Sequence, residues 1–183
     1  DGQPPNTSRK YPTGSNTNIL MLGDPVYLDV NSKVQRFQGA LTSANSPALL
    51  GVVTGLLNAD GRPLTHDLNK MIGVSASAFV LVADDPDLLF EVECSASLSF
   101  PSRIGEFATI VSGTRVTANG NSGVRLDDTP VNTAAGHPLQ IYGLSPVEVD
   151  GVGGSANNIL VRISNHVYRR VTRVQGPLEA ADA

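Results

Sequence analysis

Three acidic side chains, Asp84, Asp85 and Asp87, lie close together between two apolar runs in "FVLVADDPDLLFEVEC" (79–94). Carboxylates at this density could bind a metal ion or act as an acid and a base. A calcium loop, however, places oxygen ligands at alternate positions around a central glycine, and that pattern is absent. Residues 85–88 instead fit a type I turn, with Asp first and Pro second. We therefore interpret the cluster as a turn between two strands.

A second candidate for chemistry is "GNSG" (120–123), which is similar to the nucleophile turn of the all-β chymotrypsin-like serine proteases. His66 and any of the three aspartates precede Ser122 in the order that such a triad requires. The second Gly and the Pro that usually follow this turn are replaced by Val124 and Arg125. Asn-Gly is also a strong hairpin signal. We interpret the stretch as a turn and keep a serine hydrolase as a minor alternative.

The sequence contains few groups that could bind a metal. The three histidines, His66, His137 and His166, lie far apart, and none is four residues from another. His166 falls in a strand pattern, which favours a structural role. The single cysteine, Cys94, excludes an internal disulfide and a cysteine-based zinc site, and we expect it to be a buried thiol. We therefore expect no metal, no cofactor and no catalytic residue.

Composition narrows the class of protein further. Only 16% of residues are charged and the net charge is −4, which argues against direct nucleic-acid binding. No apolar run approaches the roughly 20 residues of a membrane helix, so we expect no membrane contact. Eighteen glycines and 12 prolines interrupt nearly every window that could form a helix. Short runs of Val, Thr, Ile and Leu between turn residues predict an all-β fold with less than about a fifth helix.

Local patterns predict several strands. Residues 25–30 and 33–38 both alternate between apolar and polar positions, and "NS" between them indicates a hairpin. Residues 48–57, "ALLGVVTGLL", are apolar on both faces, which is typical of a central strand. Gly51 and Gly55 in that run indicate bends or close backbone approaches.

We predict one compact β-barrel or β-sandwich-like domain at 19–175, preceded by an extended N-terminal arm at 1–18 and followed by a short C-terminal tail at 176–183. The arm is rich in Pro, Asn, Ser and Thr, and Tyr11 is its one aromatic residue. Such a segment cannot bury enough apolar surface to order itself. We expect a partner surface to order it, although packing on its own barrel is the alternative.

Charge is distributed unevenly along the chain. Residues 84–93 hold five acids and no base, whereas 159–175 hold four arginines and no acid. This separation either steers association with a neighbouring protein or reflects two solvated faces. The candidate partner-binding residues come from the arm and from the basic run: Pro4, Pro5, Tyr11, Pro12, Arg169, Arg170 and Arg173.

Four stretches resemble, as an ordered set, a family of tailed-bacteriophage virion proteins usually encoded near the major capsid protein. They are "LVADDPDLLFEVE" (81–93), "SGVRLDD" (122–128), "LQIYGL" (139–144) and "ILVRISNHVY" (159–168). The resemblance covers roughly residues 48–168. The sequence departs from the family in Ser164, where the family favours Asn, and in its own N-terminal arm and Arg-rich end.

The resemblance implies a non-enzymatic head decoration (cement) protein, assembled in the host cytoplasm and located on the outer surface of the virion capsid. There it would bind the major capsid protein and stabilise the head by bridging its subunits through many modest contacts. We expect a homo-oligomer, a trimer in preference to a dimer. The first alternative is another virion component, such as a tail, neck or fibre-base protein.

Overall fold

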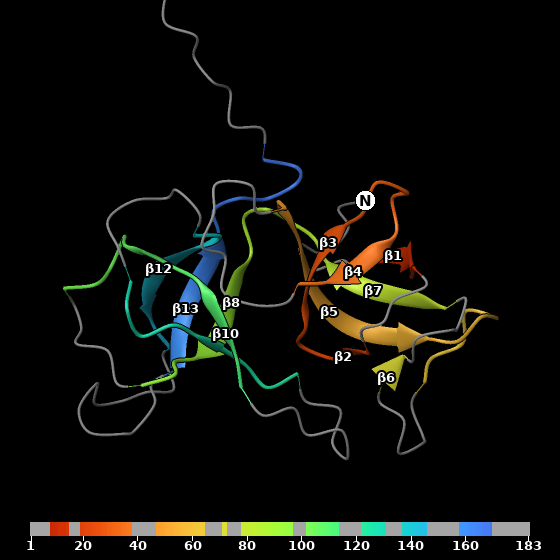
Figure 1. The fold of residues 1–183 in the computed structure, drawn as a ribbon, viewed down its shortest axis with the longest axis horizontal. Coiled ribbons are helices and arrows are strands. Elements are labelled where there is room, and N and C mark those ends of the chain that lie inside the picture. Colours follow the sequence, from red (N-terminus) through yellow and green to blue (C-terminus); the bar gives the residue numbers. More distant parts are fainter. Residues whose placement is uncertain are drawn as a thin grey trace, which may run out of the picture.

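A computed structural model describes nine segments of the chain (Figure 1). Strand accounts for 54% of the described residues and no helix occurs among them, which confirms the all-β expectation. Within the same segments, no helix is long and apolar enough to cross a membrane. The segments are residues 8–14, 19–37, 47–64, 71–72, 78–96, 102–113, 122–130, 137–145 and 158–169.

The first sheet has five antiparallel strands in the order β1-β7-β5-β3-β4. The long apolar strand predicted at 48–57 is β5, and it lies at the centre of this sheet. The strands are β1 (Arg9–Pro12), β3 (Pro25–Leu28), β4 (Val34–Arg36), β5 (Leu49–Leu57) and β7 (Phe79–Ala83).

Both glycines of β5 behave as the sequence predicts. A Cβ atom on Gly51 would lie 2.0 Å from the carbonyl oxygen of Ala83, so only glycine fits where β5 passes β7. The pairing with β7 shifts between Val53 and Gly55, which marks a bulge. The central strand therefore depends on a close backbone approach as well as on apolar burial.

The hairpin predicted from the "NS" turn is formed by β3 and β4. The Asp29 carboxylate accepts hydrogen bonds from the backbone N–H groups of Asn31 and Lys33, at 2.8 and 2.9 Å. Ser32 occupies a left-handed conformation with φ of 58°. Side-chain and backbone chemistry local to the turn thus fixes the register of this hairpin.

The second sheet has four antiparallel strands in the order β8-β13-β12-β9, and two short pairs, β10-β11 and β2-β6, accompany the two larger sheets. Tyr142 in β12 falls where its pairing with β13 shifts, and its side chain is exposed. The strands are β2 (Leu20–Met21), β6 (Met71–Ile72), β8 (Leu89–Glu93), β9 (Phe107–Ala108), β10 (Ile110–Ser112), β11 (Val124–Leu126), β12 (Leu139–Leu144) and β13 (Asn158–Ile163).

The described residues form two apolar cores, one for each large sheet. In Figure 1 the strands β8, β12 and β13 lie on the left, and β1, β3, β5 and β7 lie on the right. Leu49 packs in the core of the second sheet, whereas the next residue, Leu50, packs in that of the first. Successive side chains of a strand point to opposite faces, so β5 contributes to both cores and joins them.

The first sheet curls until its two edge strands meet. Thr13, directly after β1, forms a single parallel bridge to Val34 of β4. One bridge is not a continuous ladder, so the described residues form a curled sheet rather than a closed barrel.

The described part of the N-terminal arm, residues 8–14, packs on the chain's own body, which is the alternative to the expected ordering by a partner. Residues 9–12 form β1 and pair with β7 of the same chain. Thr13 is buried, and its backbone N–H donates to the carbonyl oxygen of Ala78 at 2.9 Å. Tyr11 packs against the first core. Backbone hydrogen bonds to β7 stabilise this segment although most of its side chains are polar. Residues 8–14 are therefore part of the folded domain.

Candidate partner-binding site

The acidic stretch is a turn, as the sequence predicts. The backbone N–H of Leu88 donates to the carbonyl oxygen of Asp85 at 3.2 Å, which closes the turn. The Asp85 carboxylate also accepts the backbone N–H of Asp87 at 2.9 Å. The Asp85 carboxylate therefore serves the local geometry of the turn between β7 and β8.

Asp84 differs from its neighbours because its residue is only 3% exposed. Its Oδ2 atom accepts a hydrogen bond from the Tyr11 hydroxyl. The Nη1 atom of Arg9 lies 3.5 Å from the same oxygen, with an exposed guanidinium. A buried carboxylate is costly unless it is paired, and within the described segments its two partners, Arg9 and Tyr11, both lie on β1. Asp84 therefore attaches the N-terminal strand to the end of β7.

The segment after β13 reaches the same place. The Tyr168 hydroxyl lies 2.8 Å from the Tyr11 hydroxyl, at hydrogen-bond distance. The Arg9 guanidinium carbon lies 5.8 Å from the centre of the Tyr168 ring. Arg169 forms an ion pair with Asp87 in the acidic turn. We call this cluster the terminal junction; it comprises Arg9, Tyr11, Asp84, Asp87, Tyr168 and Arg169.

The environment of the terminal junction keeps Tyr11 neutral. Burial raises the pKa of the Tyr11 hydroxyl, and the hydrogen bond to Asp84 raises this pKa further. A proton on Tyr11 is required for the hydroxyl to donate to the carboxylate. The Asp84 carboxylate therefore faces a neutral phenol rather than a second anion.

His166 helps to position Tyr168, a residue of the terminal junction. It is buried, and its Nδ1 atom accepts the backbone N–H of Tyr168 at 3.1 Å. Burial lowers the pKa of His166, and the backbone of Leu50 partly opposes this shift. The backbone N–H and carbonyl of Leu49 bond to the residues on either side of His166. The sequence placed this histidine on a strand, but β13 ends at Ile163 and His166 lies beyond it. An isolated parallel bridge to Leu49 holds this segment against β5.

The candidate partner-binding residues divide into two groups. Tyr11 and Arg169 bond within the chain at the terminal junction, and Pro12 ends β1. Sequence reasoning missed Asp84 and Tyr168 as the partners of Tyr11, because these residues are 73 and 157 positions from it. The remaining candidates, Pro4, Pro5, Arg170 and Arg173, lie outside the described residues, as does the tail at 176–183.

The separated charges meet within one chain. Strands β8 and β13, which belong to the acidic and the basic run, are neighbours in the second sheet. The Arg169–Asp87 ion pair joins the same two runs beyond the end of β13. Some of the residues in the acidic and basic runs thus pair with each other within the chain.

Ser122 has a structural contact that suits a turn. Its Oγ atom accepts the backbone N–H of Val124 at 3.3 Å, two residues ahead. Of the other candidate triad residues, Asp84 is bonded to Tyr11, and His66 lies outside the described residues. The described segments therefore give Ser122 a local role and no adjacent base.

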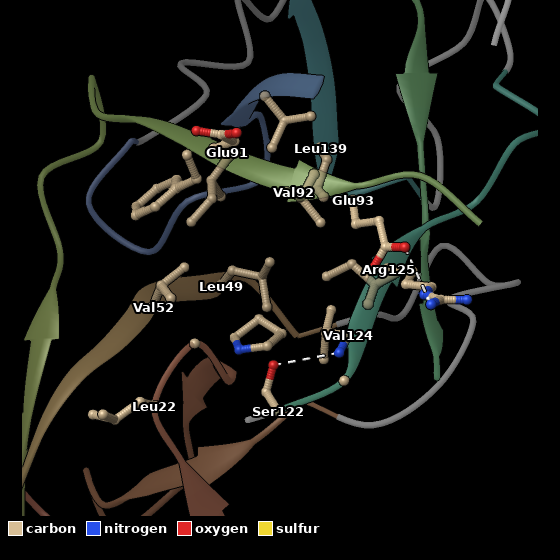
Figure 2. A pocket seen from close by; sticks show the side chains of 17 residues that line it. Leu22, Leu49, Val52, Glu91, Val92, Glu93, Ser122, Val124, Arg125 and Leu139 are labelled. Atoms are coloured by element: carbon tan, nitrogen blue, oxygen red, sulfur yellow. Dashed lines mark hydrogen bonds and ion pairs between the residues drawn. The ribbon is translucent and has the colours of Figure 1, made fainter. Parts of the chain in front are cut away.

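A cavity of about 700 Å³ lies between the second sheet, β11 and the β3–β5 side of the first sheet. Apolar side chains such as Leu49 and Val92 line much of it. Figure 2 shows Ser122 at the cavity and the ion pair between Glu93 and Arg125, whose atoms are 3.2 Å apart. The volume suits a small ligand or an inserted side chain. The lining presents three charged side chains, Glu91, Glu93 and Arg125, of which the last two are paired, and one hydroxyl, that of Ser122. This is a poor set for acid–base chemistry.

The remaining candidates for chemistry are also accounted for where the structure describes them. No group of three or more His, Cys, Asp or Glu side chains that could hold a metal occurs within the described segments. Cys94 is buried in the core of the second sheet, and burial raises the pKa of its thiol. A thiol of raised pKa is a weak nucleophile at neutral pH.

Comparisons with protein-family models, with curated proteins and with solved structures give no match. The resemblance to phage virion proteins therefore rests on the four sequence stretches quoted above.

Proposed function

We propose that this chain is a non-enzymatic virion structural protein that decorates the outer surface of a phage head. The observation that carries the proposal is that the four resembling stretches, spread over 88 positions from 81 to 168, fall on neighbouring strands. Three of them contribute β8, β12 and β13, which are adjacent in one sheet. The fourth contains β11, and Leu126 of that strand bridges to Cys94 after β8. The first stretch also includes the end of β7, in the first sheet. The resembling stretches therefore lie mostly, though not wholly, in the second sheet and beside it.

The use of the polar side chains also supports a binding role. The residues most suggestive of chemistry, Asp84 and Ser122, bond to Tyr11 and to the backbone of Val124. These hydrogen bonds are structural and give neither group a reactive role. Polar side chains used in this way suit a protein whose function is to hold other subunits together.

As a decoration protein, the chain would bind the major capsid protein and bridge its subunits. Many modest contacts repeated over a symmetric shell add up to strong attachment. A homo-oligomer, a trimer in preference to a dimer, would multiply these contacts further.

The test is to add the purified full-length chain to purified phage heads that lack it. We expect saturable occupancy in gels and by cryo-microscopy, and decorated heads should rupture at a higher temperature than bare heads. Heads of an unrelated phage serve as the control and should stay bare. A chain that fails to bind heads but co-purifies with tails would instead support the alternative, a tail, neck or fibre-base protein.

A further inference from the structure

We infer that the outer edge of β8 and the cavity beside it form a docking groove for an extended segment of a capsid subunit, which pairs with β8 as an added strand. The segment places apolar side chains in the cavity and a lysine or arginine beside Glu91. This inference rests on the proposed decoration function and adds to it the docking site and the chemistry of the partner segment.

Strand β8 is one edge of the second sheet, and its ladder partner within the described segments is β13. Just beyond β8, on the side away from β13, the backbone N–H of Ser95 donates to the carbonyl oxygen of Leu126 in β11 at 2.8 Å. Backbone groups of successive strand residues alternate between the two sides, so those of Glu91, four residues earlier, also face away from β13. An exposed edge of this kind can accept a further strand.

The inner face of β8 is incompletely covered. Phe90 and Val92 pack against the core of the second sheet, as does Val124 of β11, yet all three are only half-buried. These three residues line the cavity of about 700 Å³. Figure 2 shows Val92 and Val124 on two sides of this cavity. An occupant with apolar side chains would therefore bury surface that the described segments leave partly exposed.

The groove narrows where β8 meets β11. Leu126 forms a parallel bridge with Cys94, and Glu93 is paired with Arg125 at 3.2 Å. An added strand therefore has room beside the earlier part of β8, at residues 89–92. The cavity volume falls within the usual range of ligand pockets, which suits a few residues of extended chain.

The charges beside the groove indicate a basic segment. Glu91 is exposed on β8 and, unlike Glu93, has no cationic partner within the described segments. Opposite charges that face each other across two paired strands stabilise the pair. Because side chains alternate, a segment with Lys or Arg opposite Glu91 directs its two neighbouring residues to the cavity side, with Phe90 and Val92. The preferred segment is therefore apolar, basic and apolar in turn.

The same charges disfavour a second copy of this chain as the occupant. Pairing of β8 with the β8 strand of a second copy would bring the exposed Glu91 and Glu93 of both chains together. Like charges that face each other destabilise paired strands. Under the proposed function the capsid subunit is the protein that the chain binds, so we assign the segment to it.

The first experiment compares full-length variants for occupancy on purified heads at equal protein concentration. Glu91→Arg should lower the apparent affinity by at least about tenfold, because a basic segment then meets a like charge. Val124→Phe should also weaken binding, because the larger ring occupies the cavity. Asp60→Arg makes the same charge change in the exposed turn after β5, away from the cavity lining, and should bind as the wild type does. Thermal unfolding of each variant verifies that the fold is intact.

The second experiment measures the backbone pairing by hydrogen exchange, read by mass spectrometry at single-residue resolution. On heads, the N–H of Glu91 should exchange at least about tenfold more slowly than in the free chain, because the added strand bonds it. The N–H of Val92 faces β13 and is the internal control, so its exchange should change little.

The possible failures are distinguishable. If the wild type binds heads while Glu91→Arg binds equally well and the exchange of the Glu91 N–H is unchanged, the groove is wrong and the decoration function stands. If the wild type leaves heads bare, the proposed function fails and the inference fails with it. Self-association of the free chain that protects the Glu91 N–H would make a second copy the occupant and overturn the assignment to the capsid. A small molecule that co-purifies with the free chain and is lost in Val124→Phe would overturn it as well.

Discussion

The Tyr11 hydroxyl donates a hydrogen bond to the buried carboxylate of Asp84, 73 residues further along the chain. This single contact joins the first described strand to the acidic turn, and Tyr168 extends it to the other end of the body. The sequence presents Asp84 as one of three similar acids, yet in the structure it holds β1 and, through Tyr11, contacts the segment after β13.

Replacing Tyr11 by phenylalanine removes the donor and leaves Asp84 buried with only the exposed Arg9 beside it. We expect the free energy of unfolding to fall by about 1–3 kcal/mol, the usual cost of an unsatisfied buried polar group. Urea denaturation of the wild type and the variant measures this change in the free energy of unfolding. Tyr142→Phe, at an exposed tyrosine, should change stability by less than about 0.5 kcal/mol. Equal effects of the two variants would contradict a stabilising role for the junction.

Stability should fall as pH rises above about 10, the ordinary pKa of tyrosine in an unfolded chain. Burial and the hydrogen bond to Asp84 raise the pKa of Tyr11 in the folded protein. Above pH 10 the unfolded state therefore binds fewer protons than the native state, and unfolding becomes more favourable. Tyr11→Phe should show a shallower decline in denaturation series between pH 8 and pH 11. Parallel declines would mean that other groups dominate.

Gly51→Ala tests the close approach of β5 to β7. The added Cβ would lie 2.0 Å from the carbonyl oxygen of Ala83, so the two strands must separate. We expect a loss of about 3 kcal/mol or more, or failure to fold. Gly143→Ala is the matched control, because no atom lies within 4 Å of its added Cβ. A stable Gly51→Ala protein with unchanged Tm would rule out this packing.

Ser122→Ala separates the turn from the minor hydrolase alternative. Because Ser122 Oγ accepts only the local N–H of Val124 among its hydrogen bonds in the described segments, we expect a loss of less than about 1 kcal/mol. A serine-directed phosphonate should leave the wild type unlabelled in mass spectrometry. Labelling at Ser122 that His66→Ala prevents would establish the hydrolase instead.

Much of the secondary structure could be predicted from the sequence because its causes are local. The type I turn at 85–88 depends on a proline and on Asp85, whose carboxylate accepts the N–H of Asp87 and whose carbonyl oxygen accepts the N–H of Leu88. The β3–β4 hairpin depends on Asp29, whose carboxylate accepts the backbone N–H groups of Asn31 and Lys33. The density of glycine and proline excluded long helices before any tertiary contact had to be considered.

Only the tertiary structure decided which polar residues are buried and what they bind. Composition indicated an arm without enough apolar surface, yet residues 9–12 are a strand, because pairing with β7 satisfies backbone groups that composition does not count. Asp84, Asp85 and Asp87 are chemically alike, and only the position of Asp84 at the buried end of β7 distinguishes it. Contacts such as Tyr11–Tyr168 depend on strand order and register over the whole chain, which no short window of sequence contains.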